Sequence, residues 1–500
     1  MTDLTAELTT SSPPGSGIAS RQSWLVLIIA GLAQFMVVLD ITVVNIALPH
    51  IQSGLHFSAA NLQWVVNGYT LMFGGFLLLG GRAADLIGRK RLFLVGVVLF
   101  AAASLLNGFA QSSGMLIVGR GLQGLGGALV SPAALAIVTT TYTDQKQRTT
   151  ALASWAAISA AGSALGLLLG GVLTDIATWR WVFFINAPIG LAAVLLTLRH
   201  IPESRLETAA RRYDLAGAFT VTGGLIVLVY AIVKAEAWGW GSARTIGGFA
   251  VALALLGAFI LIEQRSKHPL MRLSIFRVRS LATGDFALLL VGSAMFGMFY
   301  FASLYVQDVL HDSPLTAGLV FLPVTGAIMI ASGFAQQTMK RLGVRNIAAA
   351  GTFIAAIGLL VLTRLPVHGR YVEDLLPGLL PLGFGLGLTF VALTVLATSG
   401  VETSDAGLAS GLFNVSQQVG GSLGLAILAT LADSQTNRLL RGHSASPIAA
   451  QVSGYHVAFF AAAIMLAGAG VALSILLRRS HLAAVERELA ASEGVAVVGA

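Results

Sequence analysis

Residues 24–48 read WLVLIIAGLAQFMVVLDITVVNIAL, an apolar run that contains a single ionisable side chain, Asp40. A helix of about 20 mostly apolar residues is long enough to cross a bilayer, so this run is predicted to span a membrane. The apolar core of a signal peptide covers only about 7–15 residues. We therefore interpret the run as a retained first span and not as a cleaved signal.

Runs of this kind recur along the whole chain. Scanning for them predicts fourteen spans. They cover residues 24–48, 63–81, 92–110, 115–138, 151–176, 182–199, 215–235, 246–264, 284–306, 316–338, 346–365, 375–398, 406–432 and 455–477. Six spans precede the seventh and eighth, and six follow them. This pattern predicts an all-α integral membrane protein with two six-helix halves and an inserted central pair, as in secondary transporters built from repeats.

The spans divide the chain into five predicted parts. These are a disordered cytoplasmic N-terminal tail (1–22), an N-terminal six-helix half (23–200), a central two-helix insertion with flanking cytoplasmic loops (201–280), a C-terminal six-helix half (281–478) and a cytoplasmic C-terminal tail (479–500). The longest loop between spans is predicted at 433–454, which leaves no room for a catalytic domain.

Composition supports a membrane protein and excludes several functions. Apolar residues make up 56% of the 500 positions and charged residues 10%, whereas roughly a quarter of a soluble domain is charged. The chain has no cysteine, which excludes disulfides, thiolate metal sites and a cysteine nucleophile. It also lacks the dipeptide Gly-Lys, which excludes a P-loop and hence ATP-driven pumping within this chain. We expect no enzyme activity, no metal and no cofactor.

The positive residues predict the orientation. With the N-terminus inside, the cytoplasmic segments hold 22 of the 30 Lys and Arg residues, as the positive-inside rule requires. An even number of spans then places both termini in the cytoplasm. The net charge of +8 is accounted for by this topology, so no nucleic-acid partner is expected.

Asp40 is the first candidate functional residue, within the segment LDITVVNIALP at 39–49, which also contains Asn45. A charged side chain at the centre of a spanning helix costs about 2.5–3.5 kcal/mol on insertion scales, so such residues are usually functional. The alternative is a structural carboxylate that caps a neighbouring helix or faces a water pocket. We treat Asp40 and Asn45 as candidates for proton coupling or substrate recognition.

The fourth span contains a second buried charge, Arg120, in LIVGRGLQGLGGA at 116–128. Gln123 lies three residues further on and therefore on the same helix face. Asp40 lies about eight residues, or roughly 12 Å, from the outer end of its span, and Arg120 about six residues, or roughly 9 Å, from the outer end of its own. The matched depths permit an Asp40–Arg120 pair, which could serve proton coupling or be purely structural.

The turn after the second span reads GRAADLIGRKR over residues 81–91. Positive residues here could simply hold the loop inside, but the spacing of Gly, Asp and basic residues is more constrained than topology requires. A carboxylate in this turn can engage helix N-termini or basic groups in one conformational state only. The candidate gating residues are Gly81, Asp85, Gly88, Arg89 and Lys90.

Glycines form a stripe along one face of the fifth span. The residues are Gly162, Gly166, Gly170 and Gly171. Small residues at this spacing let helices pack closely, and close packing alone could explain the stripe. Asp285, in the first turn of the ninth span, is a weaker candidate because a negative residue there also suits the helix dipole.

Together these segments resemble the major facilitator superfamily, specifically its fourteen-span drug:proton antiporter branch. Residues 39–49 resemble the first-span signature of the branch, and residues 81–91 the loop motif of the superfamily. Residues 116–128 resemble the fourth-span motif that carries the proton-linked arginine, and WRWVFFINAPIG at 179–190 is similar to the start of the sixth span. The likeness extends from about 24 to 477.

Two positions depart from the family pattern. The antiporter motif of the fifth span usually has proline after the glycine, but here Leu167 follows Gly166. This departure weakens any inference about the direction of exchange from that motif. Leu86 stands where the loop motif commonly has arginine, so we expect one gating contact of the family to be absent.

The resemblance implies export of drug-like or antibiotic molecules across a bacterial cell membrane in exchange for protons, driven by the proton gradient without a cofactor. The implied partners are a small-molecule substrate, protons and the lipid bilayer, and the implied functional unit is a monomer. Two alternatives remain: proton-coupled uptake or facilitated exchange of another solute on the same fold, and a membrane receptor or channel subunit that transports nothing. The two-halves layout argues against a simple channel.

Overall fold

The computed structural model describes residues 21–142, 144–204, 214–266, 269–398 and 405–477. The predicted N-terminal tail lies almost entirely outside the described residues, and the predicted C-terminal tail entirely so. Fourteen helices in the described residues are long and apolar enough to cross a membrane, which confirms the predicted number of spans.

The helices occupy the chain in the following order. The first twelve elements are α1 (Arg21–Leu55), α2 (Ala59–Leu62), α3 (Trp64–Ile87), α4 (Arg89–Gly108), α5 (Ser113–Thr141), α6 (Gln145–Ile176), α7 (Trp181–Phe184), α8 (Asn186–His200), α9 (Leu215–Trp238), α10 (Ala243–Arg265), the 3₁₀ turn η1 (Leu273–Arg277) and α11 (Arg279–Leu304). The remainder are the π-helix η2 (Tyr305–Val309), α12 (Pro314–Val320), α13 (Leu322–Leu342), α14 (Val344–Leu362), the π-helix η3 (Tyr371–Leu375), α15 (Leu376–Thr398), α16 (Ala406–Arg441) and α17 (Pro447–Leu476).

Local sequence signals fix several helix starts. Ser313 and Ser446 each accept a hydrogen bond from a backbone N–H of the first turn that follows, at the starts of α12 and α17. Each serine is followed by proline, which has no N–H to leave unsatisfied at the first helical position. Asp144 caps α6 in the same way.

The prediction of a long loop at 433–454 is wrong, because both flanking helices continue into this segment. α16 runs to Arg441 and α17 begins at Pro447, which leaves a short connection. The polar side chains that look loop-like in the sequence are satisfied between helices: Gln435 donates to Ser453 at 3.1 Å, and Asn437 donates to Glu236 of α9 at 3.3 Å. The helices therefore extend beyond their apolar segments, as α1 also does, reaching Leu55 instead of residue 48.

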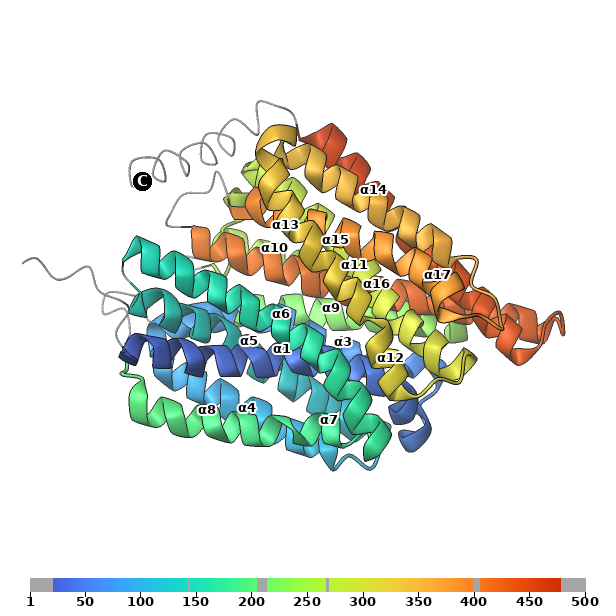
Figure 1. Cartoon of the computed structure of the whole chain (residues 1–500), viewed down its shortest axis with the longest axis horizontal. Helices are drawn as coiled ribbons and strands as arrows, with labels where there is room; N and C mark the ends of the chain where they lie inside the picture. Colours follow the sequence, from blue (N-terminus) through green and yellow to red (C-terminus); the bar gives the residue numbers. More distant parts are fainter. Residues whose placement is uncertain (1–20, 143, 205–213, 267–268, 399–404, 478–500) are drawn as a thin grey trace, which may run out of the picture.

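The spanning helices form two six-helix halves and an inserted pair, as predicted. Figure 1 shows the helices of the N-terminal half (α1 to α8) in the lower part of the view and those of the C-terminal half (α11 to α17) in the upper part. The inserted helices α9 and α10 lie behind them. Because the number of spans is even, α1 begins and α17 ends at one end of the bundle, here called the terminal end, and the opposite one is the far end.

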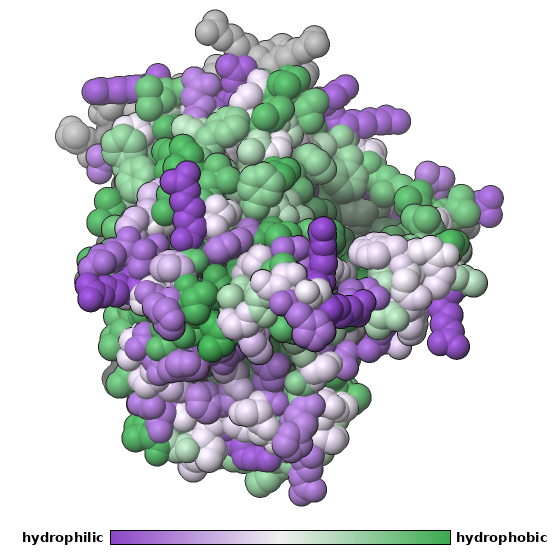
Figure 2. Space-filling model, turned by 90° about the vertical axis from the view of Figure 1, so that its right-hand side faces the viewer, coloured by the Kyte–Doolittle hydropathy of each residue, from purple (hydrophilic) through white to green (hydrophobic). Residues whose placement is uncertain are grey.

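The surface of the bundle fits a bilayer. Large apolar side chains are exposed on the flanks of many spans, among them Leu253 of α10 at 67% and Ile475 of α17 at 67%. Figure 2 looks onto the far end, where hydrophilic side chains gather across the middle and lower parts of the face and hydrophobic ones are most frequent above them. Apolar flanks with a polar end are what a helix bundle in lipid requires.

The two halves touch towards the far end. Ser303 of α11 donates to the carbonyl of Asn45 in α1 at 3.0 Å, and Gln307 of η2 donates to the carbonyl of Ile46 at 2.9 Å. In Figure 1, α6 and α12 cross at the right, whereas α6 and α13 diverge towards the left. A third contact joins α3 to α16, where the hydroxyls of Thr70 and Ser422 form a buried hydrogen bond.

Candidate functional site

The centre of the candidate site is an ion pair between the first and fourth spans. Arg120 Nη1 of α5 lies 2.5 Å from Asp40 Oδ2 of α1. Asp40 is 0% exposed and the Arg120 residue 2%. The contact that the matched depths of these residues permit is therefore present, and the pair is closed off from solvent.

Two amides complete the coordination of the Asp40 carboxylate. Gln123 Nε2 donates to Asp40 Oδ1 at 2.6 Å, and Asn186 Nδ2 of α8 donates to the same oxygen at 2.9 Å. Gln123 Oε1 in turn accepts from Arg120 Nη1 at 2.9 Å, so the amide bridges both charges. Arg120 and Gln123 reach the same carboxylate because they lie three residues apart on one face of α5.

A second layer of polar groups orients the first. Asn107 Nδ2 of α4 donates to Gln123 Oε1 at 2.8 Å, and Ser104 Oγ accepts from Asn186 Nδ2 at 3.0 Å. Arg120 Nε donates to the carbonyl of Val65 in α3 at 2.9 Å. We name Asp40, Ser104, Asn107, Arg120, Gln123 and Asn186 the polar cluster. Every member comes from the N-terminal half.

Aromatic rings cover the guanidinium. The Arg120 guanidinium carbon lies 4.5 Å from the ring centroid of Tyr69 and 5.9 Å from that of Phe183. A cation over an aromatic face gains electrostatic attraction that grows when water is excluded. The positive charge is therefore held by a carboxylate, a backbone carbonyl, an amide oxygen and two rings.

Within the polar cluster, the described structure leaves some hydrogen-bonding capacity unused. The amide oxygens of Asn107 and Asn186 are buried and have no hydrogen-bond partner among the described residues, and the same holds for the Tyr69 hydroxyl beside the cluster. Such groups are rare in protein interiors and call for an explanation. Here they offer acceptors beside a carboxylate that can also exist as a carboxylic acid.

Asn45 lies outside the polar cluster. Its side-chain amide donates to the carbonyl of Ile41 in its own helix at 3.0 Å, and its own carbonyl accepts from Ser303 of the C-terminal half. Its position therefore connects it with the contact between the halves. A role for Asn45 in proton coupling remains a prediction that the described contacts do not support.

The sequence reasoning missed three members of the cluster, Ser104, Asn107 and Asn186. Asn186 lies in the segment that opens the sixth span, and the other two lie in the third span. The available signal was a polar side chain within an apolar run, the same signal that singled out Asp40. It was too common along this chain to select these residues without knowing which helices pack together.

The turn between α3 and α4 is held by a residue that the sequence analysis did not select, Glu203. Its carboxylate accepts hydrogen bonds from the backbone N–H groups of Lys90 at 3.1 Å and Arg91 at 3.2 Å. The N–H of Arg89 donates to the carbonyl of Ser204 at 3.0 Å. A carboxylate at the first turn of a helix satisfies free donors and suits the helix dipole. The turn is thereby tied to the segment that leads towards the inserted pair.

Among the predicted gating residues, Gly88 has the clearest structural requirement. Its φ of +118° is a conformation that side chains rarely adopt. The Lys90 ammonium donates to the carbonyl of Leu198 at 3.2 Å, and Gly81 faces Pro132 of α5. Asp85 lies in the last turn of α3, but its side chain is outside the described part of the structure. The gating role of the turn remains a prediction.

Replacing Gly88 by leucine is expected to slow transport while leaving substrate affinity nearly unchanged. A Cβ at this position would lie 2.5 Å from the Glu203 carboxylate, and the backbone would be strained by about 1–3 kcal/mol. Gly239→Leu is the matched control, because Gly239 also has a positive φ, +88°, but its Cβ would meet nothing within 4 Å. Turnover and equilibrium binding should be measured on both. A tenfold loss of affinity in Gly88→Leu, about 1.4 kcal/mol, would contradict a gating role.

The glycine stripe of α6 packs mainly against α1. A Cβ at Gly166 would lie 2.9 Å from the carbonyl of Leu39, and one at Gly170 would lie 2.7 Å from that of Val43. Gly162 faces Phe35 of the same helix. Gly171 instead faces the carbonyl of Pro314 at the start of α12, in the other half. The stripe therefore serves close packing, and its last member also takes part in the contact between the halves.

Asp285 of α11 is buried, at 4% exposure, and neither carboxylate oxygen has a hydrogen-bond partner among the described residues. It lies in the second turn of the helix, in the C-terminal half.

Among the described residues, no group of three or more His, Cys, Asp or Glu side chains could hold a metal ion. The polar cluster, with its buried ion pair and connected hydrogen bonds, is therefore the strongest candidate for the functional site.

Comparisons with known proteins place the chain in a family. The sequence model of the Major Facilitator Superfamily matches residues 30–425. The puromycin resistance protein of Streptomyces alboniger is 40% identical over 472 residues, which cover 92% of each chain. The cephamycin export protein of Amycolatopsis lactamdurans is 37% identical over 454 residues, covering 90% of this chain and 92% of the relative.

Solved structures agree with this result at the level of the fold. An auto-inhibited peptide transporter of the POT family superposes with a TM-score of 0.67 at 18% identity, covering 92% of this chain and 97% of that one. A bacterial homologue of the lysosomal transporter Spinster, in its inward-facing and occupied conformation, also gives a TM-score of 0.67, at 15% identity and with 92% and 97% of the two chains covered. The chain belongs to the Major Facilitator Superfamily and is a multi-pass membrane transporter, not an enzyme.

Proposed function

We propose that this transporter exports drug-like or antibiotic molecules from a bacterial cell in exchange for protons. The names of the similar proteins, which describe resistance to puromycin and export of cephamycin, support the substrate class. The observation that carries the proton coupling is the dry ion pair of Asp40 and Arg120, surrounded by amides that can respond to the charge of the carboxylate. The transporter would act as a monomer, without a cofactor.

We further propose that the terminal end faces the cytoplasm and that the bundle lies in the cell membrane. The distribution of Lys and Arg supports this orientation, because loops at the terminal end hold most of them. The far end, with the contacts between α1 and α11, then faces the outside. Export carries the substrate from the terminal end to the far end, and protons travel in the opposite direction.

Asp40 is suited to hold the transported proton. As a carboxylate it accepts hydrogen bonds from Arg120, Gln123 and Asn186. As a carboxylic acid it becomes a donor and loses most of its attraction for the arginine. The free amide oxygen of Asn186 is then available as an acceptor after a rotation of that amide. Protonation would thereby loosen the link between α1 and α5.

The polar cluster is too deeply buried to take up a proton from water in the described conformation. Asp40, Gln123 and Asn186 are each 0% exposed. A proton can reach Asp40 only when the helices around it move, which is the property that a coupling site needs. If water reached the carboxylate in every conformation, protons would leak without transport. The burial therefore supports coupling between protonation and movement of the halves.

Movement of the halves is expected to break the contacts at the far end. Those contacts combine hydrogen bonds, such as those from Ser303 and Gln307 to α1, with close apolar packing, as where Gly171 meets Pro314. Separation of the halves must break these contacts, whereas the packing within each half can stay intact. The described conformation, with contacts towards the far end, corresponds to a state that is closed to the outside under the proposed orientation.

Locking α3 to α16 is expected to stop transport. The hydroxyls of Thr70 and Ser422 are in contact, so cysteines at both positions should form a disulfide on oxidation. The natural chain has no cysteine, so no other thiol competes. Transport by the oxidised Thr70→Cys/Ser422→Cys variant should fall by more than tenfold and return on reduction, while each single variant stays active. Full transport by the cross-linked protein would show that the halves need not separate along this contact.

Purified protein in liposomes tests the proposed function. With the lumen more acidic than the outside, puromycin should accumulate above its level in protein-free liposomes that carry the same gradient. Accumulation should disappear when the gradient is collapsed by a proton carrier. Flux that does not depend on the pH difference would instead indicate a facilitator, and no flux with any of several antibiotics would contradict the proposal.

A further inference from the structure

A cavity of 470 Å³ opens at the terminal end, between the start of α11 and the end of α17, far along the chain from the polar cluster. Its lining includes two arginines, a threonine and three large apolar residues, namely Arg277, Arg279, Thr283, Phe276, Phe286 and Leu476. Its volume lies within the range of about 300–1,000 Å³ that is usual for small-ligand sites. Its residues take no part in the proposed transport mechanism.

The positive groups of the cavity have no acidic partner among the described residues. The Arg277 and Arg279 side chains are exposed, and neither forms an ion pair with a carboxylate of the described residues. Arg272, five residues before Arg277, differs: its guanidinium lies 2.9 Å from Asp405. No acidic side chain lines the cavity. Its charge is therefore complementary to an anion.

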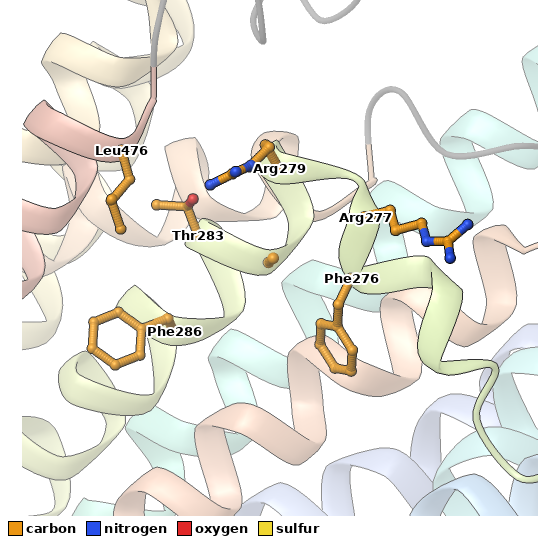
Figure 3. A pocket seen from close by; sticks show the side chains of 7 residues that line it. Phe276, Arg277, Arg279, Thr283, Phe286 and Leu476 are labelled. Atoms are coloured by element: carbon orange, nitrogen blue, oxygen red, sulfur yellow. The ribbon is translucent and has the colours of Figure 1, made fainter. Parts of the chain in front are cut away.

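The start of α11 adds backbone donors to this charge. The helix begins at Arg279, and the preceding residue, Val278, supplies no side-chain acceptor for its first turn. The first N–H groups of an uncapped helix are free to bind an anion, and phosphate is a common ligand for them. Figure 3 shows Arg279 reaching across the cavity towards Thr283 and Leu476, while Arg277 points away from them at the rim.

The rest of the lining is apolar and faces outward. Phe286 is 50% exposed and Leu476 is 44% exposed, on helices whose flanks face lipid. In Figure 3 the rings of Phe276 and Phe286 both lie below the Arg279 guanidinium, with Phe286 on the same side as Leu476 and Phe276 on the other. A ligand that fits must therefore present an anionic group at the membrane surface and hydrocarbon next to it, which describes a phospholipid.

We propose that this cavity binds the phosphate headgroup of an anionic phospholipid from the leaflet at the terminal end. Arg279 and the first turn of α11 hold the phosphate, and Arg277 strengthens the positive potential at the rim. The acyl chains lie against Phe276, Phe286 and Leu476. Basic pockets between spanning helices are suited to such headgroups, and each basic residue near an anionic surface contributes measurably to binding. Binding of a lipid here would join α17, the last span, to α11, the first span of the C-terminal half.

The test measures lipid binding to the purified full-length protein in detergent, by mass spectrometry of the intact complexes. Phosphatidylglycerol is the probe, and phosphatidylcholine and inorganic phosphate are the comparisons. Arg279→Gln should weaken phosphatidylglycerol binding by about fivefold, and Arg277→Gln/Arg279→Gln by more. Arg341→Gln is the matched control, because Arg341 is an exposed arginine at the terminal end of α13 that does not line the cavity. Its lipid binding should equal that of the unchanged protein.

A second variant keeps the test decisive if the arginine changes disturb folding. Ala282 also lines the cavity, and Ala282→Leu narrows it without removing a charge, so this variant should also weaken phosphatidylglycerol binding. If the Arg279→Gln and Ala282→Leu proteins both bound as much phosphatidylglycerol as the unchanged protein, the proposal would be overturned. It would also be overturned by equal binding of phosphatidylcholine, which would show that the headgroup charge is not recognised, or by binding of inorganic phosphate with similar affinity, which would show a site for a soluble anion.

Discussion

Arg120→Leu is expected to lower the free energy of unfolding by about 3–5 kcal/mol and to abolish transport. Removing one partner of a buried ion pair leaves the other charge uncompensated in a medium of low dielectric constant. Here the remaining charge would be the Asp40 carboxylate, which is 0% exposed. It would keep the amide donors of Gln123 and Asn186 but lose its counter-ion. The large effect follows from this burial, since exposed ion pairs contribute far less.

Thermal unfolding in detergent measures this effect, and a double-mutant cycle attributes it to the pair. The cycle compares Asp40→Asn, Arg120→Leu and the variant with both changes, which should be more stable than Arg120→Leu alone. A coupling energy of about 0.5–3 kcal/mol is typical of residues in contact. Arg180→Leu is the control, because Arg180 donates hydrogen bonds to the carbonyls of Gly108 and Ala110 and has no carboxylate partner in the described part of the chain. Strict additivity of the two single changes would contradict an interaction.

Asp40→Asn is expected to abolish export driven by a pH gradient while the protein still inserts and folds. Asparagine has nearly the same shape but cannot take up and release a proton. Arg120 loses its counter-ion in this variant, so the midpoint of thermal unfolding should fall. Arg120 retains its hydrogen bond to the carbonyl of Val65 and its contact with the ring of Tyr69, and these interactions should keep the helices together.

Resistance of a drug-sensitive host that expresses the variants gives a first measurement of this prediction. Cells with Asp40→Asn should be as sensitive to puromycin as cells without the transporter, at equal amounts of membrane-inserted protein. Asp175→Asn, which changes an exposed carboxylate at the far end of α6, should protect as well as the unchanged protein. Failure of Asp40→Asn to insert at all would favour a purely structural role for the pair.

Much of the fold could be predicted from the sequence, because the bilayer imposes strong constraints on it. A span must be long and apolar, so the fourteen helices were visible as runs. The contact of Asp40 with Arg120 was open to prediction because each is a lone charge in its span and because helix geometry converts residue counts into depths. Both features depend on one helix at a time.

The parts that could not be predicted depend on how helices pack together. Nothing local shows that Asn186 at the start of α8 meets the carboxylate of α1, or that Glu203 caps α4 from a distant segment. The polar stretch after residue 432 looked like a loop because its hydrogen-bond partners lie on other helices, α9 and α17. The lining of the cavity at the terminal end likewise comes from two segments that are distant in the sequence.

If Asp40 carries the proton that drives export, movement of substrate through the transporter must move protons in the opposite direction only while this carboxyl group is present. Liposomes containing equal amounts of folded unchanged protein or Asp40→Asn are loaded with a pH-sensitive dye, and puromycin is added outside without an imposed gradient. Puromycin that enters through the unchanged protein should drive protons out and raise the luminal pH, with no such change for Asp40→Asn. Equal proton movement in both would show that the proton travels on a group other than Asp40.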